Sequence, residues 1–133
     1  MRVLARFLRQ PPRRRALLIQ ALARVCLYRL ALACFPAGRV LRLGEGAARK
    51  APRAADQAGD ALEELRWASQ AASRRIPGTL CLAQSLAARS LYARHGWASQ
   101  LCFGARKNAD GSFEAHAWLE SHGQVVYGEA RSD

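Results

Sequence analysis

The hydrophobic pattern of the chain changes its period at Gly96, and this change limits the fold more than any other feature of the sequence. Before Gly96, apolar residues recur at helical spacing in one segment that Asp60 can cap and in another that begins between Thr79 and Cys81. After Gly96, three segments rich in β-forming residues follow, separated by turn-forming residues, at 97–105, 112–120 and 124–130. The sequence therefore predicts an α+β fold in which N-terminal helices precede an antiparallel β-meander.

Positive charge is concentrated in the N-terminal part of the chain. The 133 residues carry a net charge of +11. Residues 1–53 hold 13 Lys or Arg and one acid, whereas residues 54–133 hold 8 Lys or Arg and 9 acids. The segment 44–60 is rich in small, charged and glycine residues and predicts a connection. We therefore expect a basic amphipathic helical region at 1–53 and one core domain at 54–133.

Residues 16–35 have about the length of a membrane span, but two arginines interrupt them. Arg24 and Arg29 would each cost roughly 2.5–3.5 kcal/mol near a bilayer centre, and they also break the apolar run that a signal peptide needs. We expect instead a cytoplasmic protein with an amphipathic docking helix, on which Gln20 and Arg24 lie on the more polar, solvent-facing side. Its expected buried residues are Leu17, Leu18, Leu22 and Val25.

Two kinds of partner fit this basic helix, another protein and lipid headgroups. Basic amphipathic helices are typical of membrane surfaces, so contact with a membrane surface is one interpretation. The arginines of 9–15 are typical of nucleic-acid binding, but no aromatic residue lies between them to stack on bases. We therefore expect no nucleic-acid partner.

The cysteines do not predict a metal site. Cys26, Cys34, Cys81 and Cys102 form no C-x-x-C pair, and no histidine stands at a spacing that would complete a zinc site. No glycine-rich phosphate-binding loop is visible either. We expect no metal, no cofactor and no disulfide bond.

Cys81 and His116 are the residues best suited to catalysis. Cys81 lies in the first turn of its predicted helix, where backbone N–H groups and the positive end of the helix dipole stabilise a thiolate and can bind an oxyanion. His116 lies on the predicted strand 112–120, where it can act as the base that a nucleophilic cysteine needs. The alternative is that both are packing residues of a small core.

The third member of such a triad depends on the turn at His122 and Gly123. If these two residues form the whole loop, Ser121 pairs with Gln124 and an uninterrupted ladder places Glu129 opposite His116. A three-residue loop would place Gly128 there instead, because a slip of one residue inverts every side chain.

Three further residues belong to the candidate site. Cys102 is a rival nucleophile, because pairing of Lys107 with Gly111 would set it opposite His116, although a strand cysteine lacks the helix dipole. Gln84 and Trp118 are candidates for contact with the substrate, Gln84 as a donor to an oxyanion and Trp118 as a wall of the pocket. Each also has a structural interpretation, as a surface helix residue and a core residue.

The run 76–129 resembles the transglutaminase-like cysteine peptidase of lasso-peptide biosynthesis, the leader-cleaving B protein. Residues 16–44 resemble the N-terminal part of that family. The residues that carry the resemblance are Pro77, Cys81, Leu82, Gly96, Gly104, Arg106, the run Ala115-His116-Ala117-Trp118, Glu120 and Gly123.

The resemblance implies a papain-like hydrolase fold in which Cys81 attacks a peptide carbonyl and His116 transfers the proton. An acid on the next strand orients the histidine; the family commonly has Asp in this role, and the nearest acid here is Glu129. The implied reaction removes the leader of a ribosomally made precursor. An asparagine-synthetase-like cyclase then closes the ring, and a separate leader-recognition protein is implied because no such module is fused in front.

Two other functions compete with leader removal. A transglutaminase-like acyltransferase would use the same triad with an amine in place of water. A non-catalytic basic adaptor would bind a membrane or nucleic acid through residues 1–53 and would be indifferent to loss of Cys81.

Overall fold

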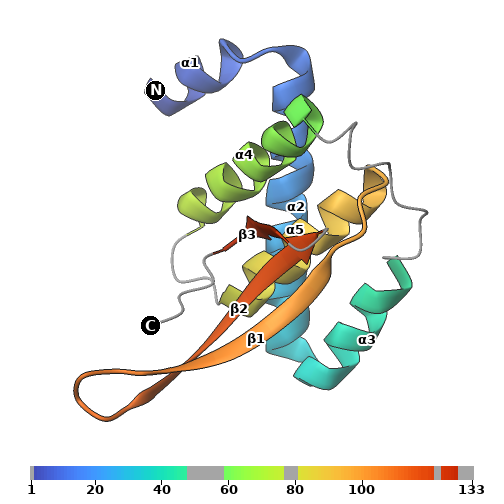
Figure 1. Ribbon diagram of the computed structural model, residues 1–133. Coiled ribbons are helices and arrows are strands. Elements are labelled where there is room, and N and C mark those ends of the chain that lie inside the picture. Colours follow the sequence, from blue (N-terminus) through green and yellow to red (C-terminus); the bar gives the residue numbers. More distant parts are fainter. Residues whose placement is uncertain (1, 48–58, 77–80, 122–123, 129–133) are drawn as a thin grey trace.

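A computed structural model describes residues 2–47, 59–76, 81–121 and 124–128 (Figure 1). Helices come first in this part of the chain, and strands follow. The helices are α1 (Arg2–Leu8), α2 (Pro12–Cys34), α3 (Ala37–Ala47), α4 (Gly59–Arg75) and α5 (Cys81–Arg94), and the strands are β1 (Gln100–Lys107), β2 (Phe113–Ser121) and β3 (Gln124–Tyr127). The strands form an antiparallel sheet in the order β1-β2-β3. The predicted α+β meander is confirmed.

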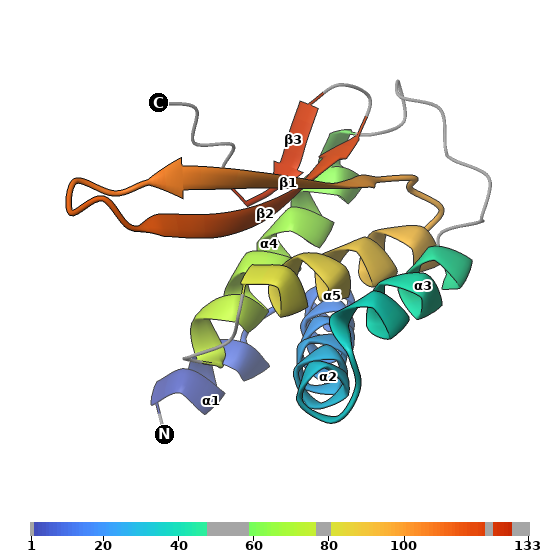
Figure 2. The same cartoon turned by 90° about the horizontal axis from the view of Figure 1, so that it is seen from below.

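The molecule has two layers, with the sheet on one side and the helices on the other (Figure 2). Helix α5 lies between the sheet and α2, and it contacts both. Along β2, Ala117 and Leu119 are buried in contact with the helical layer, while His116 and Trp118 alternate with them and are half-buried. The period of two along this strand therefore separates core residues from candidate site residues.

Helix α5 is the most buried element, and a glycine ends it where the pattern predicts. Gly96 has φ of 84°, in the left-handed region that favours glycine. Its N–H donates to the Ala93 carbonyl at 3.1 Å, and the N–H of Trp97 donates to the Tyr92 carbonyl at 2.9 Å. These bonds satisfy carbonyls that the end of the helix would leave without donors. The fully buried Trp97 then fixes the start of the sheet against the helices.

Among the described residues, one helix, α2, is long and apolar enough to cross a membrane by length and composition. In the structure it buries one face in the core, through Leu17, Leu18, Ala21, Val25 and Tyr28. The side with Gln20 and Arg24, predicted to face solvent, faces α5 instead. Arg24 donates to the Ser90 hydroxyl at 3.2 Å, and the Gln20 amide oxygen lies 3.1 Å from a ring nitrogen of His95.

The arginines at the start of α2 contact α4. Arg13 forms an ion pair with Glu64 at 3.1 Å, and the Arg14 guanidinium lies 5.1 Å from the centre of the Trp67 ring. Replacing Arg13 or Arg14 would therefore remove a contact between α2 and α4 as well as any contact with an external partner.

The structure differs from the sequence prediction at the ends of the strands. Strand β3 ends at Tyr127 rather than at residue 130. Phe113, an apolar residue at the start of β2, is 75% exposed because the β1–β2 hairpin extends beyond the helices that cover the rest of the sheet (Figure 2). The predicted domain boundary at residue 53 lies outside the described residues.

The orientation of α2 predicts opposite outcomes for two identical substitutions. Leu18 is 2% exposed and Leu30 is 65% exposed. We expect Leu18→Ala to lower the free energy of unfolding by about 2–5 kcal/mol, because it leaves a cavity in the core. Leu30→Ala should change it by less than about 0.5 kcal/mol. Urea denaturation followed by circular dichroism measures both, and equal losses would mean that the wrong face of α2 is buried.

Candidate functional site

Cys81 and His116 line one cleft, although 34 residues separate them in the sequence. Cys81 is the first residue of α5 in the described chain, so it lies in the first helical turn as predicted. His116 lies on the central strand β2. The cleft has a volume of about 350 Å³ and is bounded by α4, α5 and the end of β3. Gln84, one turn along α5, also lines it.

A buried hydrogen bond fixes the start of α5 on the sheet. The Ser85 hydroxyl, one turn after Cys81, donates to the carbonyl of Ala117 at 3.2 Å. Ala117 directly follows His116, so this bond joins the turn that carries the cysteine to the strand that carries the histidine. Ser85 is itself fully buried, and its loss would leave a buried carbonyl without this donor. The sequence reasoning did not single out Ser85.

Tyr127 is a second site residue that the sequence reasoning missed. Its hydroxyl forms a short hydrogen bond with the Ser73 hydroxyl of α4, and both residues line the cleft. Burial raises the pKa of Tyr127; the Ser73 hydrogen bond lowers it, and the nearby Cys81 raises it further. Tyr127 therefore stays protonated at neutral pH and keeps a neutral hydroxyl close to the cysteine. The strand pattern around Tyr127 gave no signal for this contact.

The His116 ring is stacked on Trp118, two residues further along β2. The ring centres are 6.0 Å apart and the planes are inclined by 24°. The Trp118 Nε1–H donates to Glu120 at 3.0 Å, which anchors the indole at its far side. Trp118 packs beside the histidine and contacts Glu120, but it is not among the residues that line the cleft, so its role as a wall of the pocket stays a prediction.

Two glycines make room for this tryptophan. Gly104 is the partner of His116 on β1, and a Cβ at Gly104 would lie 2.9 Å from the Trp118 ring. Gly128 has φ of 78°, and a Cβ there would lie 3.1 Å from that of Trp118. Gly128 also lines the cleft. Both positions therefore need a residue without a side chain for Trp118 to keep its place.

The predicted two-residue connection between β2 and β3 is confirmed, because Ser121 pairs with Gln124. The uninterrupted ladder beyond it is wrong. Glu120 pairs with Val125 but Leu119 pairs with Tyr127, so a β-bulge shifts the register by one residue. The pairing that placed Glu129 opposite His116 is lost, and Glu129 itself lies outside the described residues.

The prediction that Cys102 lies opposite His116 is also wrong. Lys107 pairs with Phe113, so Cys102 pairs with Trp118. Burial and then the charge of Glu120 raise the pKa of the Cys102 thiol, which opposes formation of a thiolate. Within the described residues, no group of three His, Cys, Asp or Glu side chains lies close enough together to hold a metal ion.

A family model of the transglutaminase-like superfamily matches residues 24–133, which is most of the chain. The chain belongs to the transglutaminase-like superfamily. No curated protein and no solved structure matches it. The superfamily includes cysteine peptidases and transglutaminases. A transglutaminase-like domain with a cysteine and a histidine in one cleft is compatible with either hydrolysis or acyl transfer.

The contact between Gly104 and Trp118 predicts the effect of adding one methyl group. Gly104→Ala should lower the free energy of unfolding by about 1–3 kcal/mol, because the anchored indole must move away. Gly38→Ala is the matched control. Nothing lies within 4 Å of a Cβ at Gly38, which is in helix α3, so the change should stabilise the protein by up to about 1 kcal/mol. Chemical denaturation measures the free energy of unfolding of both variants. A change of the same sign in both would contradict the described packing around Trp118.

Proposed function

We propose that this protein is a cysteine peptidase that removes the leader from a ribosomally synthesised lasso-peptide precursor. The observation that carries the proposal is the placement of Cys81 at the start of α5 in the same cleft as His116, within a transglutaminase-like domain. The resemblance of residues 76–129 to leader-cleaving B proteins supplies the substrate class. A papain-like arrangement of the fold is part of this proposal.

Hydrolysis begins with a proton transfer from the Cys81 thiol to His116. The thiolate sulfur attacks the carbonyl carbon of the scissile bond, and the carbonyl oxygen takes the negative charge. Backbone N–H groups at the start of an α-helix point out of the helix end and stabilise this oxyanion, and we assign the Gln84 amide, which lines the same cleft, as a further donor. Return of the proton from His116 to the nitrogen releases the amine and leaves a thioester on Cys81.

Water then completes the cycle. His116 takes a proton from the water, whose oxygen attacks the thioester carbon, and the proton returns to the departing Cys81 sulfur. The Trp118 ring restricts the motion of His116 through these steps, because it is itself held by Glu120. We assign to Glu129 the role of orienting the histidine on the resemblance alone, because the register shift in β3 removes the ladder argument for it. The acid in this role is commonly Asp in the family.

Two partners complete the proposal. A separate leader-recognition protein delivers the precursor, and an asparagine-synthetase-like cyclase closes the macrolactam after the leader is removed. In this scheme the peptidase needs no metal or cofactor of its own, because the thiolate and imidazole supply the nucleophile and the proton transfers.

Mass spectrometry of the precursor peptide, incubated with this protein and its recognition partner, tests the proposal. We expect one cut with the wild type and a loss of rate of at least about a thousandfold in Cys81→Ala and in His116→Ala. Cys102→Ala is the matched control and should cut at close to the wild-type rate.

Other products would decide against the proposal. Joining of the acyl group to an added amine in preference to water would assign an acyltransferase. Undiminished cleavage in Cys81→Ala would remove this cysteine from the mechanism.

A further inference from the structure

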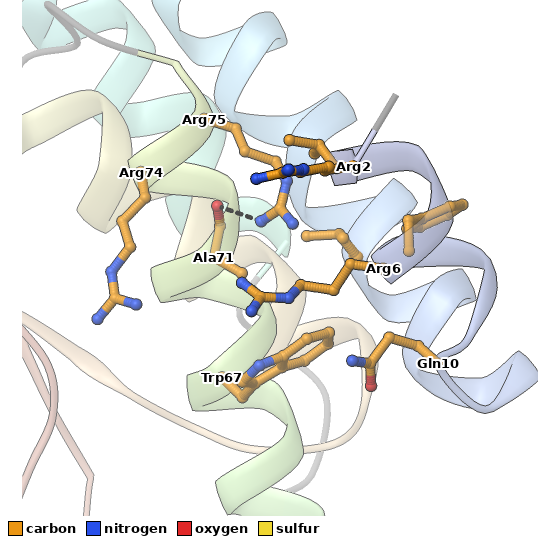
Figure 3. A pocket seen from close by; sticks show the side chains of 10 residues that line it. Arg2, Arg6, Gln10, Trp67, Ala71, Arg74 and Arg75 are labelled. Carbon is orange, nitrogen blue, oxygen red and sulfur yellow. Dashed lines mark hydrogen bonds between the residues drawn. The ribbon is translucent and has the colours of Figure 1, made fainter.

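A second and larger pocket lies beside the cleft, on the other side of α4. It has a volume of about 580 Å³ and is lined by α1, α2 and α4. We call it the arginine pocket, because four of its lining residues are Arg2, Arg6, Arg74 and Arg75. Figure 3 shows Arg2, Arg6 and Arg75 gathered between α1 and α4, with Trp67 beneath them and Arg74 on the opposite side of α4.

The guanidinium groups of this pocket lack a counter-charge within the described residues. The ion pairs of the neighbouring acids are made with other arginines: Glu64 pairs with Arg13, and Glu63 lies 3.9 Å from Arg66. Arg75 donates to the Ala71 carbonyl at 3.0 Å, which holds its guanidinium in place without neutralising it. Several like charges around one cavity repel each other, and a bound anion would relieve that repulsion.

The pocket also has an apolar wall, which a free inorganic anion would leave unused. Phe7, Leu18 and Trp67 line it beside the arginines. The Arg14 guanidinium lies over the Trp67 ring and so helps to fix it. A ligand that matches both parts carries carboxylates next to an aromatic or branched apolar group. A polypeptide with acidic and aromatic side chains has this chemistry.

Arg74 connects this pocket to the catalytic cleft. It lines both cavities, together with Cys81 and His116 on the cleft side. Arg66 adds a further positive charge to the cleft lining. A chain that crosses α4 at Arg74 would therefore lie in both cavities at once, with its scissile bond at Cys81 and an adjoining segment in the arginine pocket.

We propose that the arginine pocket binds an acidic segment of the substrate polypeptide, containing an aromatic or branched apolar residue, and so positions the adjoining peptide bond at Cys81. This inference rests on the proposed peptidase function for its catalytic part. The binding itself does not require turnover. It assigns α1 and α4 a role in substrate selection.

Fluorescence anisotropy with the full-length Cys81→Ala protein tests the binding. The probe is a fluorescein-labelled peptide with several glutamates around one tyrosine, compared with the same peptide carrying glutamines. We expect the glutamate peptide to bind more tightly, and the double variant Arg2→Gln/Arg6→Gln to weaken it about tenfold. Arg2 and Arg6 are solvent-exposed, so circular dichroism should show an intact fold.

The matched control is Arg39→Gln/Arg42→Gln, which removes the same charge from exposed positions on α3. It should change binding by less than about twofold, because these residues are outside the pocket. Equal weakening by both double variants would overturn the inference, since the attraction would then be a general effect of net charge. Equal binding of the two peptides would overturn the inference too. So would displacement of the probe by pyrophosphate at concentrations at which the unlabelled glutamate peptide does not displace it.

A cleavage assay separates this inference from the proposed function. With Cys81 intact, Arg2→Gln/Arg6→Gln should slow precursor cleavage at limiting substrate and leave the saturated rate nearly unchanged, as expected when ground-state binding is lost. Loss of peptide binding with no effect on cleavage at limiting substrate would reject the pocket as a substrate site. Selective peptide binding by a wild-type protein that cuts nothing would reject the peptidase and retain the pocket.

Discussion

Helix α5 is buried between the sheet and the other helices, and this packing sets how both layers meet. Its buried residues include Ala83, Ala87 and Ala88, whose small side chains allow neighbouring elements to approach closely. Leu86, Leu91 and Tyr92 fill the remaining space, and the Tyr92 hydroxyl donates to the carbonyl of Val126 at 3.0 Å. A helix enclosed in this way cannot rotate about its axis, so the direction of Cys81 at its start is fixed by packing.

The positive charge of the N-terminal part has two uses in the structure. Arg13 and Arg14 contact α4, and Arg24 contacts α5. Arg2 and Arg6 instead face a cavity with an apolar wall. Net charge alone suggested one basic surface, whereas the helices divide the arginines between internal contacts and a candidate binding site. A membrane-surface role for α2 stays a prediction, and its exposed Ile19, Leu27 and Leu30 are the residues it would use.

The sequence predicted the order of elements, the place of Cys81 in a first helical turn and the place of His116 on a strand, because these follow from periodicity and helix ends. It did not predict the bulge between β2 and β3. The position of one extra residue in a strand depends on how Val126 and Tyr127 pack, and the residues of the turn do not determine it. It also missed the contacts of Ser85 and Tyr127, which join residues 32 and 54 positions apart. Contacts of this kind are set by how elements cross, and local patterns do not contain that information.

Cross-linking shows whether Cys81 and His116 belong to one site, and it needs no substrate. Dibromoacetone joins a reactive thiol to an imidazole within reach of its short carbon bridge, and peptide mapping by mass spectrometry identifies the joined residues. We expect a Cys81–His116 bridge in the folded protein and no such bridge in urea. A bridge from His116 to Cys102, or alkylation of Cys81 that leaves His116 unmodified, would contradict it.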